Sequence, residues 1–304
     1  MNPDAYTISE KMMTVTDGHK LYVQAWGNPA AKTTFVFLHG GPGSGCHDGH
    51  KELFNPRKHK VVFFDQRGAG RSLPYGSLEQ NNTQALIEDL DTITKRLSLK
   101  TFVLVGGSWG STLALAYGLQ YPEKVSAMVL RGLFTGSQQE INFVDKGHFK
   151  DFYPEVWEAF VARTPKSHQQ NPAAYHAPRV LGKNEKAAKE SAYAYSELES
   201  SLISLDDRHT PEDFETFDPA GSKIEIHYLE NRCFMQDNYI LDNVHKLTMP
   251  IWLVQGRYDA ICPPSTAFAL SKLIPKNTLI WTIAGHSGSD RGNADAVRSI
   301  VSGL

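Results

Sequence analysis

The chain of 304 residues is 41% hydrophobic and 21% charged, and its formal net charge at pH 7 is −2. This length suits one large domain or a domain with an insertion, and the charge argues against a nucleic-acid-binding protein, which is usually strongly basic. We expect no secretory signal and no membrane span, because the amino terminus lacks a basic and apolar leader and no run of about eighteen apolar residues occurs. The three cysteines, Cys46, Cys233 and Cys262, match neither a zinc site nor a disulfide framework, so we expect a cytoplasmic protein.

Short apolar runs rich in β-branched and aromatic residues predict strands buried on both faces of a sheet. These runs are 21–26, 34–38, 61–65, 102–105, 127–130, 251–255 and 278–283. Helical patterns alternate with them, at 111–120, 265–273, 294–301 and in a segment that Thr83 is expected to cap. This alternation predicts a mostly parallel α/β sheet flanked by helices.

The middle of the chain, residues 135–245, has a different composition. Strand-like runs are absent there and long polar, helix-favouring stretches replace them. The segment contains 19 acidic and 11 basic residues, a balance of −8, whereas the remainder contains 14 acidic and 20 basic residues, a balance of +6. We therefore predict a catalytic core of residues 1–134 and 246–304 and a helical cap of residues 135–245 above the carboxyl ends of the strands.

A glycine-flanked serine lies between the apolar run 102–105 and the helical segment 111–120. The pattern Gly106-x-Ser108-x-Gly110 is typical of a nucleophile elbow, a tight strand-to-helix turn that exposes a serine hydroxyl beside a helix N-terminus. The alternative is a glycine-rich connecting turn without catalytic function. The flanking strand and helix favour the elbow, so Ser108 is the candidate nucleophile.

A serine nucleophile needs a base and an acid, and the α/β-hydrolase order places the acid before the histidine. Asp259 follows the predicted strand 251–255, and His286 follows the predicted strand 278–283. Both positions lie at the sheet edge where such folds build their sites. Asp290 and His39 are less suitable candidates, because neither directly follows the appropriate strand.

Catalysis by acyl transfer also requires two donors for the developing oxyanion. The N–H of Trp109, next to the candidate nucleophile, is one candidate. The other lies in the glycine-rich loop after the strand 34–38, where we favour Gly41 and take Gly40 as second choice. A phosphate-binding role of this loop is disfavoured because it lacks both the P-loop lysine and the GxGxxG order.

Six motifs together resemble the proline iminopeptidase, or prolyl aminopeptidase, family of α/β-hydrolases. They are HGGPGSG (39–45), DQRGAGRS (65–72), GGSWGSTLALAY (106–117), RGLFT (131–135), GRYD (256–259) and GHS (285–287). The resemblance implies an eight-stranded sheet with an inserted helical cap and release of N-terminal proline from small peptides through an acyl-enzyme. It also implies that no metal or cofactor takes part.

The family recognises the substrate's free imino terminus with carboxylates of the cap. The matching segments assign this function to Glu199, in YSELE, and to Glu230, in YLEN, and they place Arg131 and Phe134 near the proline pocket. Buried cations need paired anions, and the negative balance of the cap agrees with the assignment. The chain departs from the family where cap aromatics are replaced, for example by Asp145, which bears on how strictly it selects proline.

Two other functions remain open at this point. The chain could be a carboxylesterase or arylamidase of the same fold whose cap binds an acyl chain, although an acyl pocket should be apolar. It could also be a non-catalytic small-molecule-binding protein, although all three triad residues are present. The oligomeric state is not predictable from the sequence.

Overall fold

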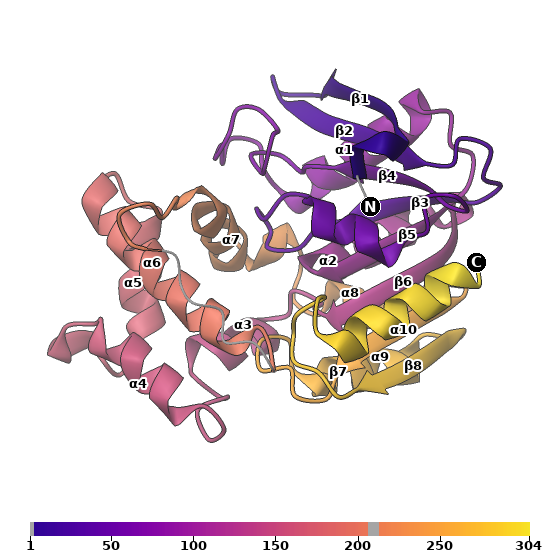
Figure 1. The fold of residues 1–304 in the computed structure, drawn as a ribbon. Coiled ribbons are helices and arrows are strands. Elements are labelled where there is room, and N and C mark those ends of the chain that lie inside the picture. The colour runs from indigo at the N-terminus through magenta and orange to yellow at the C-terminus, as the bar shows by residue number, and fades with distance from the viewer. Residues whose placement is uncertain (1–2, 206–212) are drawn as a thin grey trace.

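The computed structural model describes residues 3–205 and 213–304, and within them one eight-stranded sheet has the order β1-β2-β4-β3-β5-β6-β7-β8 (Figure 1). The strands are β1 Thr7–Thr14, β2 Lys20–Gly27, β3 Thr34–Leu38, β4 Lys60–Phe64, β5 Phe102–Ser108, β6 Val125–Leu133, β7 Ile251–Gly256 and β8 Asn277–Thr282. β2 pairs antiparallel with β1 and β4, and the other neighbours are parallel. The predicted α/β-hydrolase sheet is confirmed.

How deeply each strand is buried explains whether it could be recognised in the sequence as an apolar run. β3 is buried at every position and β4 at all but its first, so both stand out as continuous apolar runs. β1 lies at the edge of the sheet and most of its residues are exposed, so it carries no apolar run and was not among the predicted strands.

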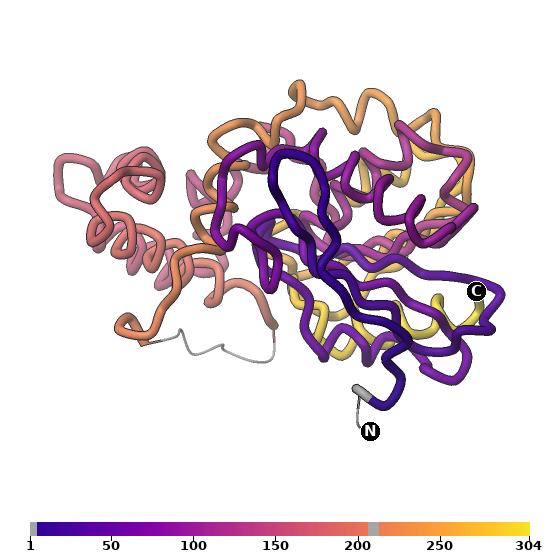
Figure 2. The backbone as a smooth tube through the Cα atoms, turned by 90° about the horizontal axis from the view of Figure 1, so that it is seen from above, coloured from indigo at the N-terminus to yellow at the C-terminus, as the bar shows by residue number. Residues whose placement is uncertain are grey.

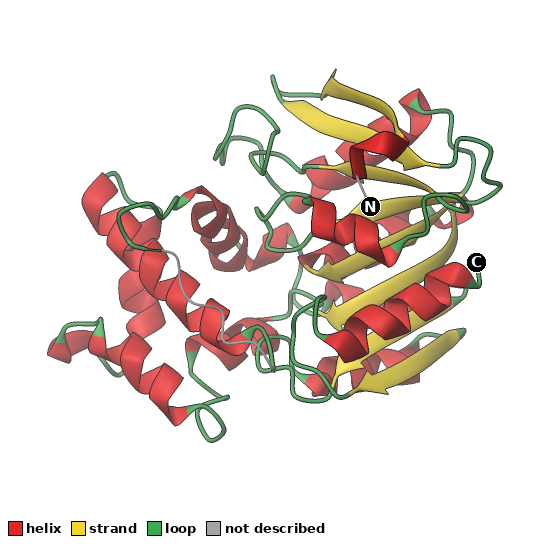
Figure 3. Cartoon of the chain, in the orientation of Figure 1, coloured by secondary structure: helices red, strands yellow, loops and turns green. Residues whose placement is uncertain are grey.

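Four helices cover the two faces of the sheet (Figure 3). They are α1 Thr83–Arg96, α2 Trp109–Gln120, α9 Pro264–Leu273 and α10 Arg291–Ser302. One apolar cluster includes residues of α1, α2 and α9, and a second on the opposite face includes Val297 and Val301 of α10. The start of α1 differs from expectation, since Asn82 is the cap residue and accepts a hydrogen bond from the N–H of Ala85.

A group of helices interrupts the core between β6 and β7 and stands beside the sheet in two perpendicular views (Figures 1 and 2). These helices are α3 Gln138–Asp145, α4 Pro154–Ala162, α5 Pro172–Val180, α6 Glu185–Leu202, α7 Ala220–Glu230 and α8 Tyr239–Asn243. Several of them share an apolar cluster of their own, which includes Phe160, Tyr195 and Ile226. We propose residues 135–245 as the cap, whose last helix already packs on the core through Ile240.

The cap faces the edge of the sheet toward which the arrowheads of β5 to β8 point (Figures 1 and 3). Because parallel strands end together at one edge, residues that follow β3, β5, β7 and β8 are brought beneath the cap. In the described part of the chain, no helix is long and apolar enough to cross a bilayer.

Candidate active site

The link between β5 and α2 is a strained turn centred on Ser108. This residue has φ 56° and ψ −128°, a conformation that costs a non-glycine residue roughly 1–3 kcal/mol. The flanking glycines are required by contact distances. A Cβ atom on Gly106 would lie 2.4 Å from the Gly110 carbonyl oxygen, and one on Gly110 would lie 2.1 Å from the Leu38 carbonyl oxygen. The backbone therefore has the geometry of a nucleophile elbow.

Asp259 and His286, which follow β7 and β8, form a buried hydrogen-bonded pair. Their side chains are joined between Oδ2 and Nδ1 at 2.8 Å, and the residues are only 3% and 5% exposed. Asp259 Oδ1 accepts bonds from the N–H groups of Ile261 at 3.0 Å and Cys262 at 2.8 Å. Gln255 Nε2 donates to Oδ2 at 3.0 Å. These donors fix the position of the carboxylate, so that it can orient the imidazole.

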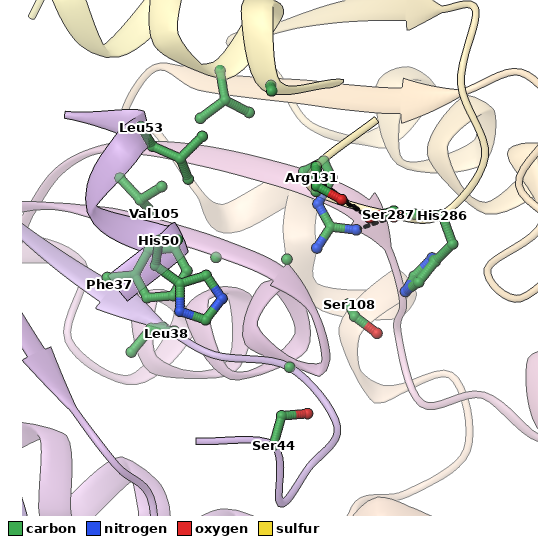
Figure 4. A pocket seen from close by; sticks show the side chains of 18 of the residues that line it. Phe37, Leu38, Ser44, His50, Leu53, Val105, Ser108, Arg131, His286 and Ser287 are labelled. Carbon is green, nitrogen blue, oxygen red and sulfur yellow. Dashed lines mark hydrogen bonds between the residues drawn. The ribbon is translucent and has the colours of Figure 1, made fainter. Parts of the chain in front are cut away.

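Ser108 and His286 line the same cavity, and Figure 4 shows their side chains next to each other. No hydrogen bond joins the two in the described structure, and catalytic contacts of unliganded enzymes often tighten only around a bound substrate. We propose that Ser108, His286 and Asp259 act as nucleophile, base and orienting acid.

The two less suitable candidates have structural partners of their own. The His39 ring is locked inside the glycine-rich loop, since its Nε2 accepts a bond from Gln66 N at 2.9 Å and its Nδ1 lies 2.9 Å from the Gly40 carbonyl oxygen. Asp290 accepts the N–H of Gly285 at 2.6 Å and that of Leu205 at 3.2 Å. It thereby connects the loop that carries His286 to the cap segment that follows α6.

The glycine-rich loop lies against the candidate nucleophile. Gly40 and Gly41 both line the cavity, and a Cβ on Gly40 would lie 3.3 Å from Ser108 Cβ. Gly41 has φ +100°, and a Cβ there would lie 2.6 Å from the amide nitrogen of Gly43, so only glycine fits. Trp109 is the first residue of α2, where backbone N–H groups have no partner within the helix. We propose the N–H groups of Gly41 and Trp109 as the oxyanion donors.

The cavity has a volume of about 530 Å³, and residues of the cap are part of its lining. Two carboxylate residues of the cap line it, Glu199 from α6 and Glu225 from α7. The second helix is tied to the nucleophile elbow, because Tyr228 of α7 makes an edge contact with the Trp109 ring at 4.8 Å between centroids. The first helix is tied to the histidine loop, because Ser287 N donates to the Ile203 carbonyl at 2.6 Å.

The two cap glutamates perturb each other. Burial raises the pKa of Glu199 to about 7; the hydrogen bond with Glu225 opposes this rise and the charge of Asp145 adds to it. Burial also raises the pKa of Glu225 well above its usual range, and the charge of Glu199 adds to the effect. Two adjacent carboxyl groups in a desolvated site tend to share a proton until a cation arrives. The pair is therefore an anionic site suited to a buried ammonium group.

We expect this pair of glutamates to make the protein less stable at neutral pH than at pH 4.5. Because both pKa values are raised on folding, the native state binds more protons than the unfolded chain between about pH 4.5 and 7, so unfolding free energy falls as pH rises there. We expect Glu225→Gln to raise the unfolding free energy at pH 8 by the order of 1–3 kcal/mol, and much less at pH 4.5. Denaturant titrations at the two pH values measure this, and an equal change at both would contradict it.

Of the three remaining predicted residues, Arg131, Phe134 and Glu230, only Arg131 lines the cavity. Arg131 lines it, whereas Phe134 is not a lining residue and packs, half-buried, against the core cluster. Glu230 is the last residue of α7, has an exposed side chain, and is not a lining residue either. Its charge, after burial, helps raise the pKa of Asp145 to about 6. We therefore propose Glu225 in place of Glu230 as the partner of Glu199.

The sequence contained a signal for Glu225 that the motif match passed over. It stands between Ile224 and Ile226, which are 1% and 3% exposed. A glutamate between two apolar residues of a helix is a candidate for a partly buried position that needs a partner or a ligand, whereas Glu230 lies two residues after Tyr228, the last buried residue of that helix. No group of three or more metal-ligating side chains occurs in the part of the chain that the structure describes.

The fold, the elbow and the acid–imidazole pair define a hydrolase of the α/β hydrolase fold, and the model of that family matches residues 33–290. Among solved structures, an esterase from Thermogutta terrifontis superposes with a TM-score of 0.66 at 19% identity, over 97% of this chain and 96% of that one. The proline iminopeptidase of Mycobacterium smegmatis superposes with a TM-score of 0.65 at 17% identity, over 97% of both. At such identities these two likenesses establish the fold alone.

Sequence similarity is more specific than these superpositions. The proline iminopeptidase of Xylella fastidiosa strain 9a5c is 35% identical, over 97% of this chain and 96% of that protein. Those of Neisseria gonorrhoeae and Arabidopsis thaliana are 36% and 37% identical, over 95% and 92% of this chain and 94% and 75% of their own lengths. The chain therefore belongs to the proline iminopeptidase family.

Proposed function

We propose that the chain is a serine aminopeptidase that releases N-terminal proline from small peptides, as its family membership indicates. The observation that carries the proposal is that two carboxylates of the cap, Glu199 and Glu225, line the same cavity as Ser108 and His286. An acidic pair at the far wall of an acyl-transfer site provides an anchor for a protonated amine. It thus selects substrates with a free amino terminus.

The anchor suits the chemistry of a prolyl terminus. A protonated pyrrolidine nitrogen has two N–H donors, and each can be directed to one carboxylate, which forms charge-assisted hydrogen bonds in a desolvated site. Because the nitrogen is one bond removed from the α-carbon, anchoring it also fixes the first carbonyl near Ser108. A residue before the proline would remove the positive charge of the anchored nitrogen and would have to occupy the place of the cap carboxylates, so the proposed enzyme is an exopeptidase.

The proposed reaction is acyl transfer in two steps. His286 takes the proton of the Ser108 hydroxyl as its oxygen attacks the prolyl carbonyl, and Asp259 stabilises the imidazolium. The N–H groups of Gly41 and Trp109 stabilise the oxyanion. The imidazolium protonates the leaving amine as the C–N bond breaks, and water, activated by the same histidine, then releases proline from the acyl-enzyme.

Esterase activity on acyl chains is less well supported. An acyl-binding cap should present an apolar pocket, yet the cap residues that line this cavity include two glutamates. The likeness to solved esterases concerns the fold, which does not determine the substrate.

Three substrates with the same enzyme separate these functions. Prolyl-2-naphthylamide has a free amine, N-acetylprolyl-2-naphthylamide has none, and p-nitrophenyl acetate is a simple ester. We expect efficient turnover of the first and at least about 10²-fold lower kcat/KM for the second, because removing one partner of a buried charge pair costs about 3–5 kcal/mol. Comparable rates on the first two would refute an amine anchor, and failure to cleave the first would refute the aminopeptidase. A fluorophosphonate should label Ser108 and abolish every activity.

A further inference from the structure

Arg131, near the end of β6, presents a guanidinium group to the catalytic cavity (Figure 4). Its Nη1 donates to the carbonyl oxygen of His286. A Cβ on Gly107, the residue before the nucleophile, would lie 2.2 Å from Nη2. The guanidinium therefore lies directly beside both the nucleophile elbow and the histidine loop.

The positive charge of Arg131 has no carboxylate partner in the described structure. None of the ion pairs among the described residues includes it, whereas buried Arg67 is paired with Asp89 at 2.7 Å. Of the described side-chain nitrogen and oxygen atoms that are sealed from solvent, only His19 Nδ1 lacks a hydrogen bond. The unused N–H groups of Arg131 are thus not sealed, and since this residue lines the cavity, they face it.

Burial lowers the pKa of Arg131, and the charge of Asp259 opposes that effect. A half-buried cation without a paired anion is unfavourable, and the cost is removed when an anion binds. The acidic residues among the described cavity-lining side chains are Glu199 and Glu225 in the cap and Glu52, which is exposed. The cavity thus carries negative charge on its cap wall and positive charge on its core wall, beside the nucleophile.

We propose that Arg131 binds the C-terminal carboxylate of a dipeptide substrate, whose amino terminus is held by Glu199 and Glu225. This proposal rests on the proposed function and adds to it a preference for the length of the substrate. Two extended residues span about 7 Å, so a dipeptide places opposite charges on either side of its one peptide bond. The planar guanidinium fork matches a carboxylate and binds it through paired hydrogen bonds.

The consequence is a preference for prolyl dipeptides with a free carboxylate over the same dipeptides with an amide end. Hydrogen bonds to a charged group contribute about 1.5–3 kcal/mol, which corresponds to roughly 10–150-fold in kcat/KM. A longer peptide places its C-terminal carboxylate beyond Arg131 and loses this contact. The enzyme then acts most efficiently on the last products of peptide breakdown.

The test compares Pro-Gly with Pro-Gly-amide, which differ in one charge. We expect the wild-type enzyme to cleave Pro-Gly at least 10-fold more efficiently, Arg131→Met to reduce the ratio of the two kcat/KM values to about one, and Arg131→Lys to keep part of it. Because Arg131 also contacts the histidine loop, the absolute rates of its variants will fall. Because that loss affects both dipeptides equally, it cancels in the ratio of their kcat/KM values.

Arg298→Met is the matched control, because Arg298 also lines the cavity but pairs with Asp295 at 2.7 Å. It should leave the ratio unchanged. Equal rates of the wild type on the two dipeptides, or an unchanged ratio in Arg131→Met, would overturn the subsite even if the variant were poorly active. Cleavage of prolyl-2-naphthylamide reports the proposed function separately, since this substrate has no carboxylate.

Discussion

Replacing Ser108 with alanine is expected to lower kcat for a prolyl amide by about 10⁵–10⁶-fold. The hydroxyl oxygen is the only group of the proposed triad that bonds to the substrate, so its removal also eliminates the acyl-enzyme. The oxyanion donors and the cap glutamates remain, and a small residual rate above that of water is expected from them. Stopped assays over hours with prolyl-2-naphthylamide measure the loss, and mass spectrometry of fluorophosphonate-treated protein checks that labelling has disappeared.

Binding should survive the Ser108→Ala substitution. Since Glu199 and Glu225 anchor the amine independently of the hydroxyl, calorimetric Kd values of a prolyl amide should stay within a few-fold of the KM of the wild type. The matched control is Ser44→Ala, because Ser44 is another serine that lines the cavity. A variant of Ser108 that keeps a tenth of its activity, or a Ser44 variant that loses most of it, would invalidate the assignment of the nucleophile.

Replacing Glu225 with glutamine is expected to lower kcat/KM for prolyl-2-naphthylamide by about 10²–10³-fold, because breaking a buried ion pair costs about 3–5 kcal/mol. Glutamine keeps the shape of the side chain, removes its charge and replaces one acceptor oxygen with an NH₂ donor. Burial disfavours a lone cation in the cavity, so the loss should fall mainly on binding and positioning of the substrate. Steady-state kinetics of the purified variant provide the measurement.

Two comparisons make this result specific to the amine anchor. Glu230→Gln, on the exposed end of the same helix, should change the same kcat/KM less than about three-fold, which is the range of a surface substitution. Hydrolysis of p-nitrophenyl acetate by Glu225→Gln should stay close to that of the wild type, since this ester has no amine. A larger loss in the Glu230 variant, or an equal loss on the ester, would argue against Glu225.

At Asp145 the chain departs from the family motif, and the structure changes how that departure is interpreted. The motif comparison treats it as the loss of an aromatic residue, but its charge acts on the pKa of Glu199. It therefore strengthens the negative potential of the cap instead of simply enlarging the pocket. The sequence could not show this, because Asp145 and Glu199 are 54 positions apart (199 − 145) and come close enough to interact only in the folded cap.

The sequence by itself determined the α/β core and the order of the turns that carry the candidate site residues. Buried parallel strands are continuous apolar runs, and the elbow around Ser108 requires small residues at fixed spacing, so both are local properties. Asp259 and His286 were predictable for the same reason, since each directly follows a strand. Only the tertiary structure decided which cap glutamate faces the cavity and that Arg131 lies there without a carboxylate partner. Glutamates at different positions of one helix point in different directions. The packing of helices that are distant in the sequence determines which of these side chains faces the nucleophile.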